Sequence, residues 1–304
     1  MISKSQHYSA WGGDTNGSYT LTDEDVEKLH DVLLGMYKKV NTVCEHYDIH
    51  LIAAGGTSLG AVRHHGFIPW DDDMDLFMFR ADFEKLKNIF ESELGDEYYL
   101  LAPGTKQGAN CFLPRIVKKN TTLLGMIDET APYPHGIYID INIIEYAPEN
   151  AFLFKWKMLG ADIRRFISYS VYWNQYKSKS WRTYMLGSKG AKYYKLRMLI
   201  GKIFSFKSAE KWFASFDKYV QGKESKVVTV PSGTKKYGGE RLELSVINPL
   251  KKIPFEDTDI YVFNNYDRYL TNLYGNYMTI PKMENREHHM CLKLSFTEET
   301  MNII

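Results

Sequence analysis

The hydrophobic positions near the start of the chain follow a helical repeat. Apolar residues recur every three or four positions from Val26 to Val40, and Thr22 precedes an acidic first turn. We therefore expect a helix from about Thr22 to His46. The same spacing predicts an amphipathic helix over Ala81–Leu94. The first third of the chain thus holds two helices that each bury one face.

Short apolar or alternating runs between and after these helices predict strands. Residues 152–221 have a mostly helical pattern, with interruptions near 177–180 and 187–190. The fold class that this order indicates is α+β, a mixed sheet with flanking helices, interrupted by a helical block. The predicted strands are Leu51–Ala54, Asp73–Phe79, Tyr98–Leu101, Cys111–Val117, Thr121–Met126, Ile137–Ile144, Val227–Val230 and Leu242–Leu244; the shorter helices are Leu59–Arg63 and Asn265–Leu273; Pro249–Pro254 is turn-rich.

The same pattern divides the chain into four parts. Residues 1–20 are polar and rich in Gly and Ser, and we expect them to be loosely ordered. Residues 21–150 form the predicted core and residues 151–225 a helical insertion. Residues 226–304 return to strands and complete the core.

Composition restricts the class of protein. The 304 residues are 44% apolar and 25% charged, which is typical of a globular protein. The sequence contains no run of 18 apolar residues, so we expect no membrane span. The first residues lack the apolar segment of a secretory signal. The three cysteines are far apart, so we expect neither a disulfide framework nor a zinc cluster. A reduced, cytoplasmic setting is the expectation.

The net charge of +1 hides a strong asymmetry. Residues 151–211 contain 14 Lys or Arg and two acids, which gives +12 there and −11 elsewhere. The same segment holds 14 of the 44 aromatic residues. Near-neutrality argues against a uniformly basic nucleic-acid binder, and we expect no nucleic-acid partner. Cations mixed with aromatic rings predict docking on an anionic membrane surface or acceptor, and the alternative is an ordinary solvated basic face.

The sharpest chemical feature is a cluster of acids at Asp71, Asp72, Asp73 and Asp75. On a strand, Asp73 and Asp75 would point to one side and Asp72 to the other. Two carboxylates on one face repel each other, and a divalent cation such as Mg²⁺ relieves that repulsion with hard oxygen ligands. A solvated turn is the alternative for an acidic run that stands alone.

Two further features suit the same chemistry. Asp140 lies between two isoleucines on a probable core strand, an unusual place for an acid unless it faces a site or is buried and hydrogen-bonded. The turn Gly55-Gly56-Thr57-Ser58 separates a strand from a helix start, where backbone N–H groups and hydroxyls can hold a phosphate. A Gly-Gly turn is by itself a common feature, but the combination has the layout of the nucleotidyltransferase superfamily.

The residues that carry these features resemble the LicD family of phosphocholine transferases, with the fukutin-type proteins as more distant relatives. The string GGTSLGAVRHHGFIPWDDDMDL at residues 55–76 closely matches the family hallmark. Residues 269–281, YLTNLYGNYMTIP, are a second match, followed by His288 and His289. Residues 135–146, HGIYIDINIIEY, match more weakly. The resemblance covers most of residues 22–146 and 255–290 and leaves out the helical block.

The resemblance implies a nucleotidyltransferase-like catalytic core and transfer of phosphocholine from CDP-choline to a hydroxyl of a cell-surface glycan, with release of CMP. The acceptor would be a glycan of the lipopolysaccharide, teichoic acid or capsule type, free or linked to a lipid. The cofactor would be Mg²⁺ or Mn²⁺. Carried over by position, Asp73 and Asp75 are metal ligands, and Asp140 is a third ligand or the base. The expected location is cytoplasmic, at the inner face of the cell membrane.

The remaining site residues also follow from the resemblance. Gly55, Gly56, Thr57 and Ser58 would contact the diphosphate, Arg63 or Arg115 would neutralise its charge, Tyr274 and Tyr277 would line a pocket for the quaternary ammonium, and His288 and His289 would contact the phosphate or the metal. For each tyrosine, ordinary packing is the alternative, and for the histidine pair a solvated loop.

Two departures from the family pattern leave the substrate open. The family often has Asp-Ile-Phe-Pro-Leu-Asp where this chain has Asp140-Ile-Asn-Ile-Ile-Glu145, and an acid where this chain has Asn276. Other donors, such as CDP-ribitol or CDP-glycerol, are therefore alternatives. Two further alternatives are an enzyme that transfers the nucleotide itself and a non-catalytic scaffold in glycan assembly. The intact Asp73, Asp75 and Asp140 argue against the scaffold.

Overall fold

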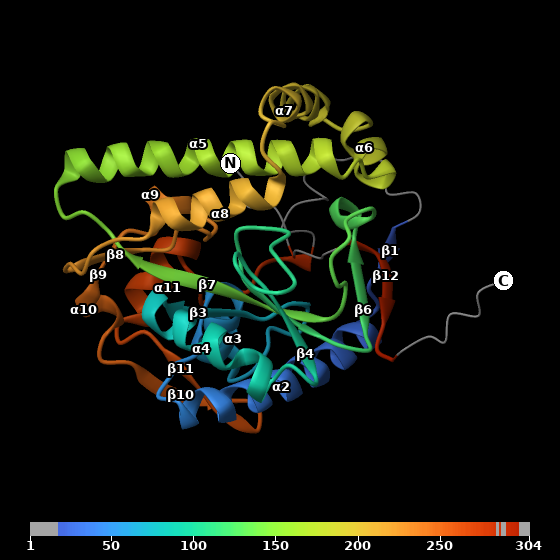
Figure 1. Ribbon diagram of the computed structural model, residues 1–304. Helices are drawn as coiled ribbons and strands as arrows, with labels where there is room; N and C mark the ends of the chain where they lie inside the picture. The colour runs from blue at the N-terminus through green and yellow to red at the C-terminus, as the bar shows by residue number, and fades with distance from the viewer. Residues whose placement is uncertain (1–17, 284–285, 287–289, 298–304) are drawn as a thin grey trace.

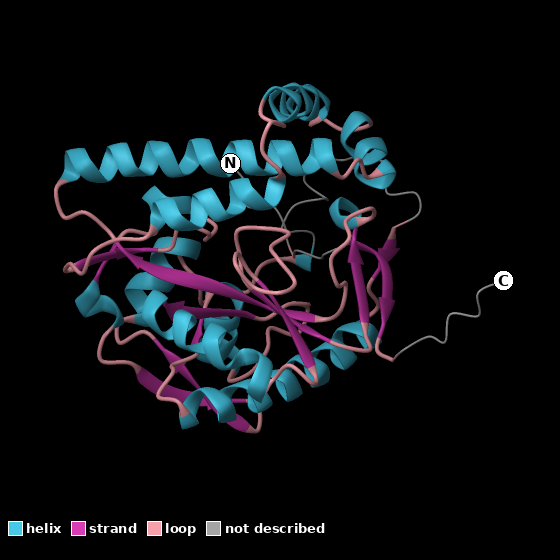
Figure 2. Cartoon of the chain, viewed as in Figure 1, coloured by secondary structure: helices cyan, strands magenta, loops and turns pink. Residues whose placement is uncertain are grey.

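A computed structural model describes residues 18–283, 286 and 290–297 of the chain. A nine-stranded mixed sheet forms its centre, with helices on both faces (Figure 1). The strand order is β10-β11-β2-β3-β7-β5-β4, and β8 and β9 extend from the end of β7. The α+β fold with a mixed sheet is thus confirmed. The helical block lies along one side of the sheet (Figure 2).

The observed elements agree with most of the predicted ones. The strands are β1 (Tyr19–Thr20), β2 (Ile52–Ala53), β3 (Asp75–Phe79), β4 (Tyr98–Leu101), β5 (Arg115–Lys118), β6 (Thr122–Gly125), β7 (Tyr138–Tyr146), β8 (Val227–Thr229), β9 (Leu242–Glu243), β10 (Lys251–Phe255), β11 (Thr258–Val262) and β12 (Met290–Ser295). The helices are α2 (Asp23–His46), α3 (Gly55–His64), α4 (Arg80–Glu93), η1 (Met126–Asp128), α5 (Ala151–Gln175), α6 (Lys179–Leu186), α7 (Ala191–Ile203), α8 (Ala209–Val220), α9 (Lys236–Gly239), α10 (Leu244–Ile247) and α11 (Tyr266–Tyr274).

The first helix shows how local sequence sets an element. The hydroxyl of Thr22 accepts a hydrogen bond from the backbone N–H of Asp25, and the Asp25 carboxylate accepts one from the backbone N–H of Thr22. This capping box satisfies N–H groups that the helix leaves without internal partners. The start predicted at Thr22 is confirmed.

Four local predictions were wrong. The strand expected over Cys111–Val117 begins only at Arg115. The Gly-Gly-Thr-Ser segment is not a turn before a helix, because α3 already begins at Gly55. The strand expected from Asp73 begins only at Asp75, so Asp73 lies in the preceding loop. The segment expected to be turn-rich contains β10, which pairs in an antiparallel hairpin with β11. Hydrogen bonding to a neighbouring strand overrides the local turn propensity there.

Alternation along β7 separates the core from the polar side of the sheet. Ile139, Ile141 and Ile143 are buried in the cluster that packs under α2 and α4. Side chains on a strand alternate between faces, so Asp140 and Asn142 point to the opposite face. One hydrophobic cluster thus lies on the Ile139 side of β7, and Asp140 and Asn142 point to the other side, where Ile144 joins a second cluster.

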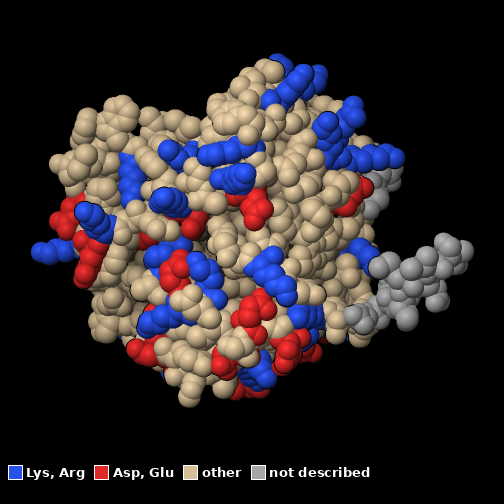
Figure 3. All heavy atoms as spheres, viewed as in Figure 1, with Lys and Arg blue, Asp and Glu red and all other residues tan. Residues whose placement is uncertain are grey.

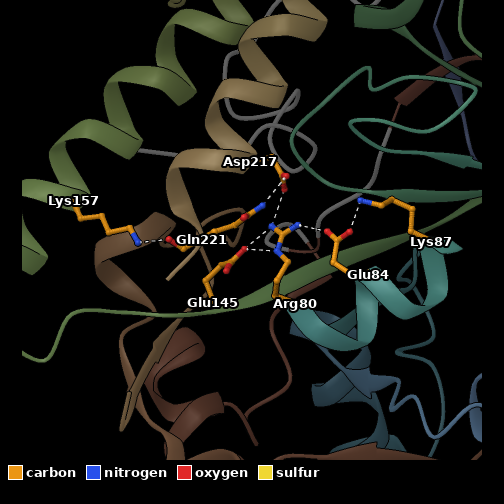
Figure 4. A network of polar contacts seen from close by, with 7 residues as sticks. All are labelled: Arg80, Glu84, Lys87, Glu145, Lys157, Asp217 and Gln221. Carbon is orange, nitrogen blue, oxygen red and sulfur yellow. Dashed lines mark hydrogen bonds and ion pairs between the residues drawn. The ribbon is translucent and has the colours of Figure 1, made fainter. Parts of the chain in front are cut away.

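The helical block shares a hydrophobic core with the loops beside the sheet. Phe154, Tyr172 and Phe213 from the helices are buried in one cluster with Phe112 and Met126. An ion network around the buried Glu145 also joins the block to the sheet (Figure 4). Arg80, directly after β3, donates to Glu145 of β7 at 2.8 Å and to Asp217 of α8 at 2.7 Å.

Two other features complete the fold. Strands β1, β12 and β6 form a separate three-stranded sheet at the edge of the molecule (Figure 1). Across the described ranges, none of the helices combines the length and the apolar character that a bilayer crossing requires.

Candidate active site

The predicted carboxylates meet in a pocket between the polar face of the sheet and helix α5. Asp73 and Asp75 line it from the β3 side, Asp140 lines it from β7, and Arg165 and Tyr169 close it from α5. These residues are far apart in the sequence. The pocket is therefore a product of sheet pairing and of the packing of the helical block.

The centre of the site is a row of three side chains on neighbouring strands. Asp75 and Asp140 are register partners in the parallel pair β3–β7, and Arg115 is the partner of Asp140 in the antiparallel pair β5–β7. Residues in register share a face of the sheet, so all three side chains point into the pocket. Each of the three lines it.

Arg115 holds Asp140 by a charge-assisted hydrogen bond. The guanidinium Nε donates to Asp140 Oδ1 at 2.7 Å, and the guanidinium lies 4.2 Å from the centre of the Tyr138 ring. Burial opposes the charge of this guanidinium, but Asp140 and further acidic groups nearby raise the pKa of Arg115 well above its ordinary value. The pair is thus a fixed part of the pocket wall, with Asp140 engaged by Arg115.

The acidic loop is arranged differently from the strand that the sequence suggested. Asp72, expected on the opposite side from Asp73 and Asp75, lines the same pocket and is buried. The reason is that strand alternation starts only at Asp75, so the loop is free to turn Asp72 inward. The loop is anchored from α2, where the ring of His30 makes a 2.6 Å hydrogen bond to the carbonyl oxygen of Asp71.

The Gly-Gly-Thr-Ser segment packs directly on the acidic loop. A Cβ at Gly56 would lie 2.4 Å from a carboxylate oxygen of Asp71, and Gly55 has a φ of +47°, in the left-handed region that favours glycine. The hydroxyl of Thr57 accepts a 3.0 Å hydrogen bond from the backbone N–H of Asp75. The Ser58 hydroxyl is buried and has no hydrogen-bond partner among the described residues. Glycine is needed here because the backbone approaches carboxylates closely.

The other predicted binding residues lie outside the pocket lining or at its edge. Arg63 donates to the carbonyl oxygen of Tyr277 at 2.7 Å, and the Tyr277 hydroxyl donates to Asp267 at 2.8 Å. Tyr274 is 45% exposed as a whole residue, but its hydroxyl lies beside Gly55, where loss of solvent and the charges of nearby carboxylates, first Asp71 and then Asp75, raise its pKa well above the ordinary value. Its hydroxyl thus lies at the acidic loop. His288 and His289 lie outside the described residues.

Several pocket residues were not predicted from the sequence. Asn142 donates to Asp75 Oδ1 at 3.2 Å and lies two positions after Asp140, a spacing that strand alternation could have identified. Arg165 donates to the carbonyl oxygens of Pro231 at 3.1 Å and Gly233 at 3.3 Å. Its burial lowers its pKa to about 10. No local pattern marks Arg165, because its role depends on a loop 66 residues away.

Glu240 is another pocket residue that the sequence did not reveal. It is buried and accepts a 3.0 Å hydrogen bond from the backbone N–H of Lys235. Burial raises its pKa to about 7. The carboxyl group therefore titrates near neutral pH at the pocket wall.

The two departures from the family pattern fall at different places. Asn142, within the first departure, lies in the pocket, whereas Glu145 at its end pairs with Arg80 in the ion network away from it. Asn276 is exposed just after α11. Only the first departure therefore changes the pocket wall.

The charge of the pocket suits a cation. Six carboxyl groups line it, against two guanidiniums that are already engaged with Asp140 and with backbone carbonyls. Carboxylate and amide oxygens are the ligands that Mg²⁺ and Mn²⁺ prefer, so the donor set at Asp73 and Asp75 fits such an ion. Within the described ranges, however, no three His, Cys, Asp or Glu side chains are gathered in a metal-holding arrangement. The metal ligands stay a prediction.

Comparison with known proteins identifies the class. Residues 48–106, which contain α3, the acidic loop and β3, match the family model described as LicD/FKTN/FKRP, nucleotidyltransferase domain. This segment is therefore similar to that nucleotidyltransferase class.

Two relatives extend the match. The chain is 26% identical over 269 residues to the lipopolysaccharide cholinephosphotransferase LicD of Haemophilus influenzae, covering 85% of this chain and 93% of that protein. It is 37% identical over 76 residues to the uncharacterized protein RP689 of Rickettsia prowazekii, covering 23% of this chain and 29% of that one. These matches confirm the resemblance to the LicD family drawn from the sequence.

Proposed function

We propose that this chain transfers phosphocholine from CDP-choline to a hydroxyl of a cell-surface glycan and releases CMP. The observation that carries the proposal is the row of Asp75, Asp140 and Arg115 across three neighbouring strands, with Asp73 in the same pocket. The name of the Haemophilus relative supports phosphocholine as the group transferred and lipopolysaccharide as an acceptor class.

The bond changes of the proposed reaction balance without a further reactant. The acceptor oxygen attacks the phosphorus that bears choline, the bond from that phosphorus to the bridging oxygen breaks, and CMP leaves with the electron pair. The acceptor hydroxyl loses its proton to a base. In-line displacement of this kind depends mainly on positioning and on charge stabilisation.

We assign Asp140 as that base. Its Oδ1 is held by Arg115, which fixes the carboxylate at the pocket wall, and it lies in register with Asp75. Asp73 and Asp75 would hold Mg²⁺ or Mn²⁺, which would supply neutralising charge to the diphosphate when bound. The contacts of Thr57 and Asn142 with Asp75 orient it toward the pocket.

The aromatic side chains of the pocket suit a quaternary ammonium. Tyr169 and Tyr269 line the same cavity as the carboxylates, and so do Phe112 and Tyr138, over whose rings the guanidiniums of Arg165 and Arg115 lie. Aromatic faces and carboxylates both attract a trimethylammonium group, which carries charge but donates no hydrogen bond. The aromatic faces are the feature that supports choline over ribitol and glycerol, because those polyols carry no positive charge for a ring to attract.

A panel of donors tests the proposal. The protein is incubated with CDP-choline, CDP-ribitol or CDP-glycerol, a purified lipopolysaccharide or teichoic acid acceptor, and Mg²⁺, and CMP and the modified glycan are measured. We expect both products with CDP-choline. If products form only with CDP-ribitol or CDP-glycerol, the assignment of CDP-choline as donor is wrong. If the glycan carries the nucleotide, the assignment of the reaction type is wrong.

A further inference from the structure

Helices α5 and α7 each leave an apolar stripe exposed. On α5 the stripe begins at Phe152, which is 66% exposed, and on α7 it is followed by Phe206, which is 76% exposed. The members recur every three or four positions, so each set forms one line along its helix. The stripe residues are Phe152, Trp156, Leu159 and Ile163 on α5, and Leu196, Leu199 and Ile203 on α7 with Phe206 just beyond it.

Both stripes lie opposite the packed faces of their helices. At about 100° per residue, Trp156 and Ile163 lie on the far side of α5 from the buried Phe154 and Ala161. On α7, Leu199 lies opposite the buried Tyr194 and Arg197 by the same count, and other members of the stripe flank it. The inner face of α7 packs closely on α5, so its stripe cannot be covered by α5.

The close packing places α7 on the outer side of α5. A Cβ at Gly201 of α7 would lie 2.0 Å from the carbonyl oxygen of Ser170 on α5. Figure 1 shows α7 outside α5, on the side away from the sheet. The two stripes therefore both face outward, away from the catalytic core.

Cations surround the stripes. Eight Lys or Arg side chains on or beside α5, α6 and α7 are exposed, and none of them forms an ion pair within the part of the chain that the structure describes. Figure 3 shows Lys and Arg side chains over α6 and α7 at the upper edge of the molecule, while the acidic side chains in this view lie mainly lower. The eight are Lys155, Lys177, Lys179, Arg182, Lys189, Lys192, Lys195 and Lys202.

We propose that the outer faces of α5 and α7 dock on an anionic lipid surface. Large exposed apolar residues gathered on two neighbouring helices mark an interaction surface, and the surrounding cations select a negatively charged partner. Docking of a second copy on the same face would bring like charges together. Aromatic and aliphatic side chains enter the headgroup boundary while the lysines contact the lipid phosphates.

The docking surface and the pocket share helix α5. Arg165 and Tyr169 line the pocket from the inner side of this helix, and Ile163 lies on its outer side. A helix is about 10 Å across, so docking would hold the pocket near the lipid headgroups. Together with the proposed function, on which this step rests, the arrangement suits a lipid-linked glycan acceptor.

Vesicle sedimentation tests the docking. The full chain is mixed with vesicles of phosphatidylcholine alone or of phosphatidylglycerol with phosphatidylcholine, and the bound fraction is measured after centrifugation. We expect binding to the anionic vesicles, at least tenfold weaker binding to the neutral ones, and a loss at high salt because salt screens exposed charges. The variants Trp156→Ser/Leu199→Ser and Lys192→Glu/Lys195→Glu should each weaken binding at least tenfold.

A matched control separates this surface from total charge. Lys251→Glu/Lys252→Glu makes the same charge change on β10, far from the helical block, and should leave binding within twofold of the unmodified chain. Equal losses in both lysine pairs, or no binding to anionic vesicles, would overturn the proposal. A dimer that becomes monomeric in Trp156→Ser/Leu199→Ser, without vesicle binding, would also overturn it.

A second readout separates docking from catalysis. CMP release with a water-soluble acceptor should be unchanged in Trp156→Ser/Leu199→Ser, because neither residue lines the pocket. Absence of CMP release in the unmodified chain would refute the proposed function while vesicle binding still tested the docking surface.

Discussion

Asp75 and Asp140 lie opposite each other on the parallel strands β3 and β7, and both line one pocket. Sixty-five positions separate them in the sequence, so only the pairing of the strands makes them neighbours. On its other side Asp140 accepts a hydrogen bond from Arg115. The site is therefore a row of charge across the sheet, which separate substitutions can test.

Asp75→Asn removes the charge of one predicted metal ligand and keeps its shape. We expect CMP release to fall by at least about a hundredfold, because charge stabilisation at the transferred phosphoryl group is lost. The folded structure should remain, as judged by circular dichroism. Asp96→Asn, at an exposed position away from the pocket, is the matched control and should retain activity. Full activity of Asp75→Asn would contradict the assignment.

Arg115→Met removes the partner of Asp140. Loss of one partner leaves a largely buried carboxylate without its counter-charge, so the free energy of unfolding should fall by about 3 kcal/mol. Urea denaturation measures the change. Adding Asp140→Asn to this variant should cost little more, since the pair acts as a unit. Additive losses would show that Arg115 and Asp140 contribute independently.

Gly56→Ala tests the close approach of α3 to the acidic loop. The added methyl group would lie 2.4 Å from an oxygen of Asp71, so the loop must shift. We expect a clear loss of CMP release with little change in stability, because a flexible carboxylate can move. Gly35→Ala on α2 is the matched control, as nothing lies within 4 Å of its new methyl group. It should stabilise the chain by up to about 1 kcal/mol and keep activity.

Glu240→Gln tests a buried carboxyl group with a raised pKa. Its pKa rises from 4.5 to about 7 on folding, so the folded state binds the extra proton between these values. The resulting stability is complete below pH 4.5 and is lost as the pH rises through about 7. Glutamine does not titrate, so at pH 8 the free energy of unfolding of the variant should exceed that of the unmodified chain by up to about 3 kcal/mol. At pH 5 the variant should show no such gain. A gain of equal size at both pH values would contradict this account.

Arg80→Met tests the network that ties the helical block to the sheet. Arg80 contacts Glu145 and Asp217, and its loss leaves Glu145 buried without its counter-charge (Figure 4). We expect the free energy of unfolding to fall by about 3–5 kcal/mol. Lys28→Met, which breaks the exposed pair with Glu24, should change the free energy of unfolding far less, because solvent screens that pair. Similar losses in both variants would mean that burial of the network contributes little.

Some elements could be predicted because their determinants are local. The helix after Thr22 carries its capping residues and its apolar repeat within its own sequence, and the acids of the loop at residues 71–75 are close together in the sequence. The start of β3 could not be placed in the same way. Asp73 and Asp75 fit an alternating pattern equally well, and only hydrogen bonding to β2 and β7 decides that the strand begins at Asp75.

The sequence by itself determined the α+β class, the acidic cluster, the isolated Asp140 and the concentration of positive charge in residues 151–211. Only the tertiary structure decided that Arg115 engages Asp140 and that Arg165 and Glu240 belong to the pocket. It also decided that the apolar stripes of α5 and α7 face outward. The physical reason is that capping, periodicity and charge are local properties, whereas register across a sheet and the burial of a helix face depend on contacts between residues distant in the chain.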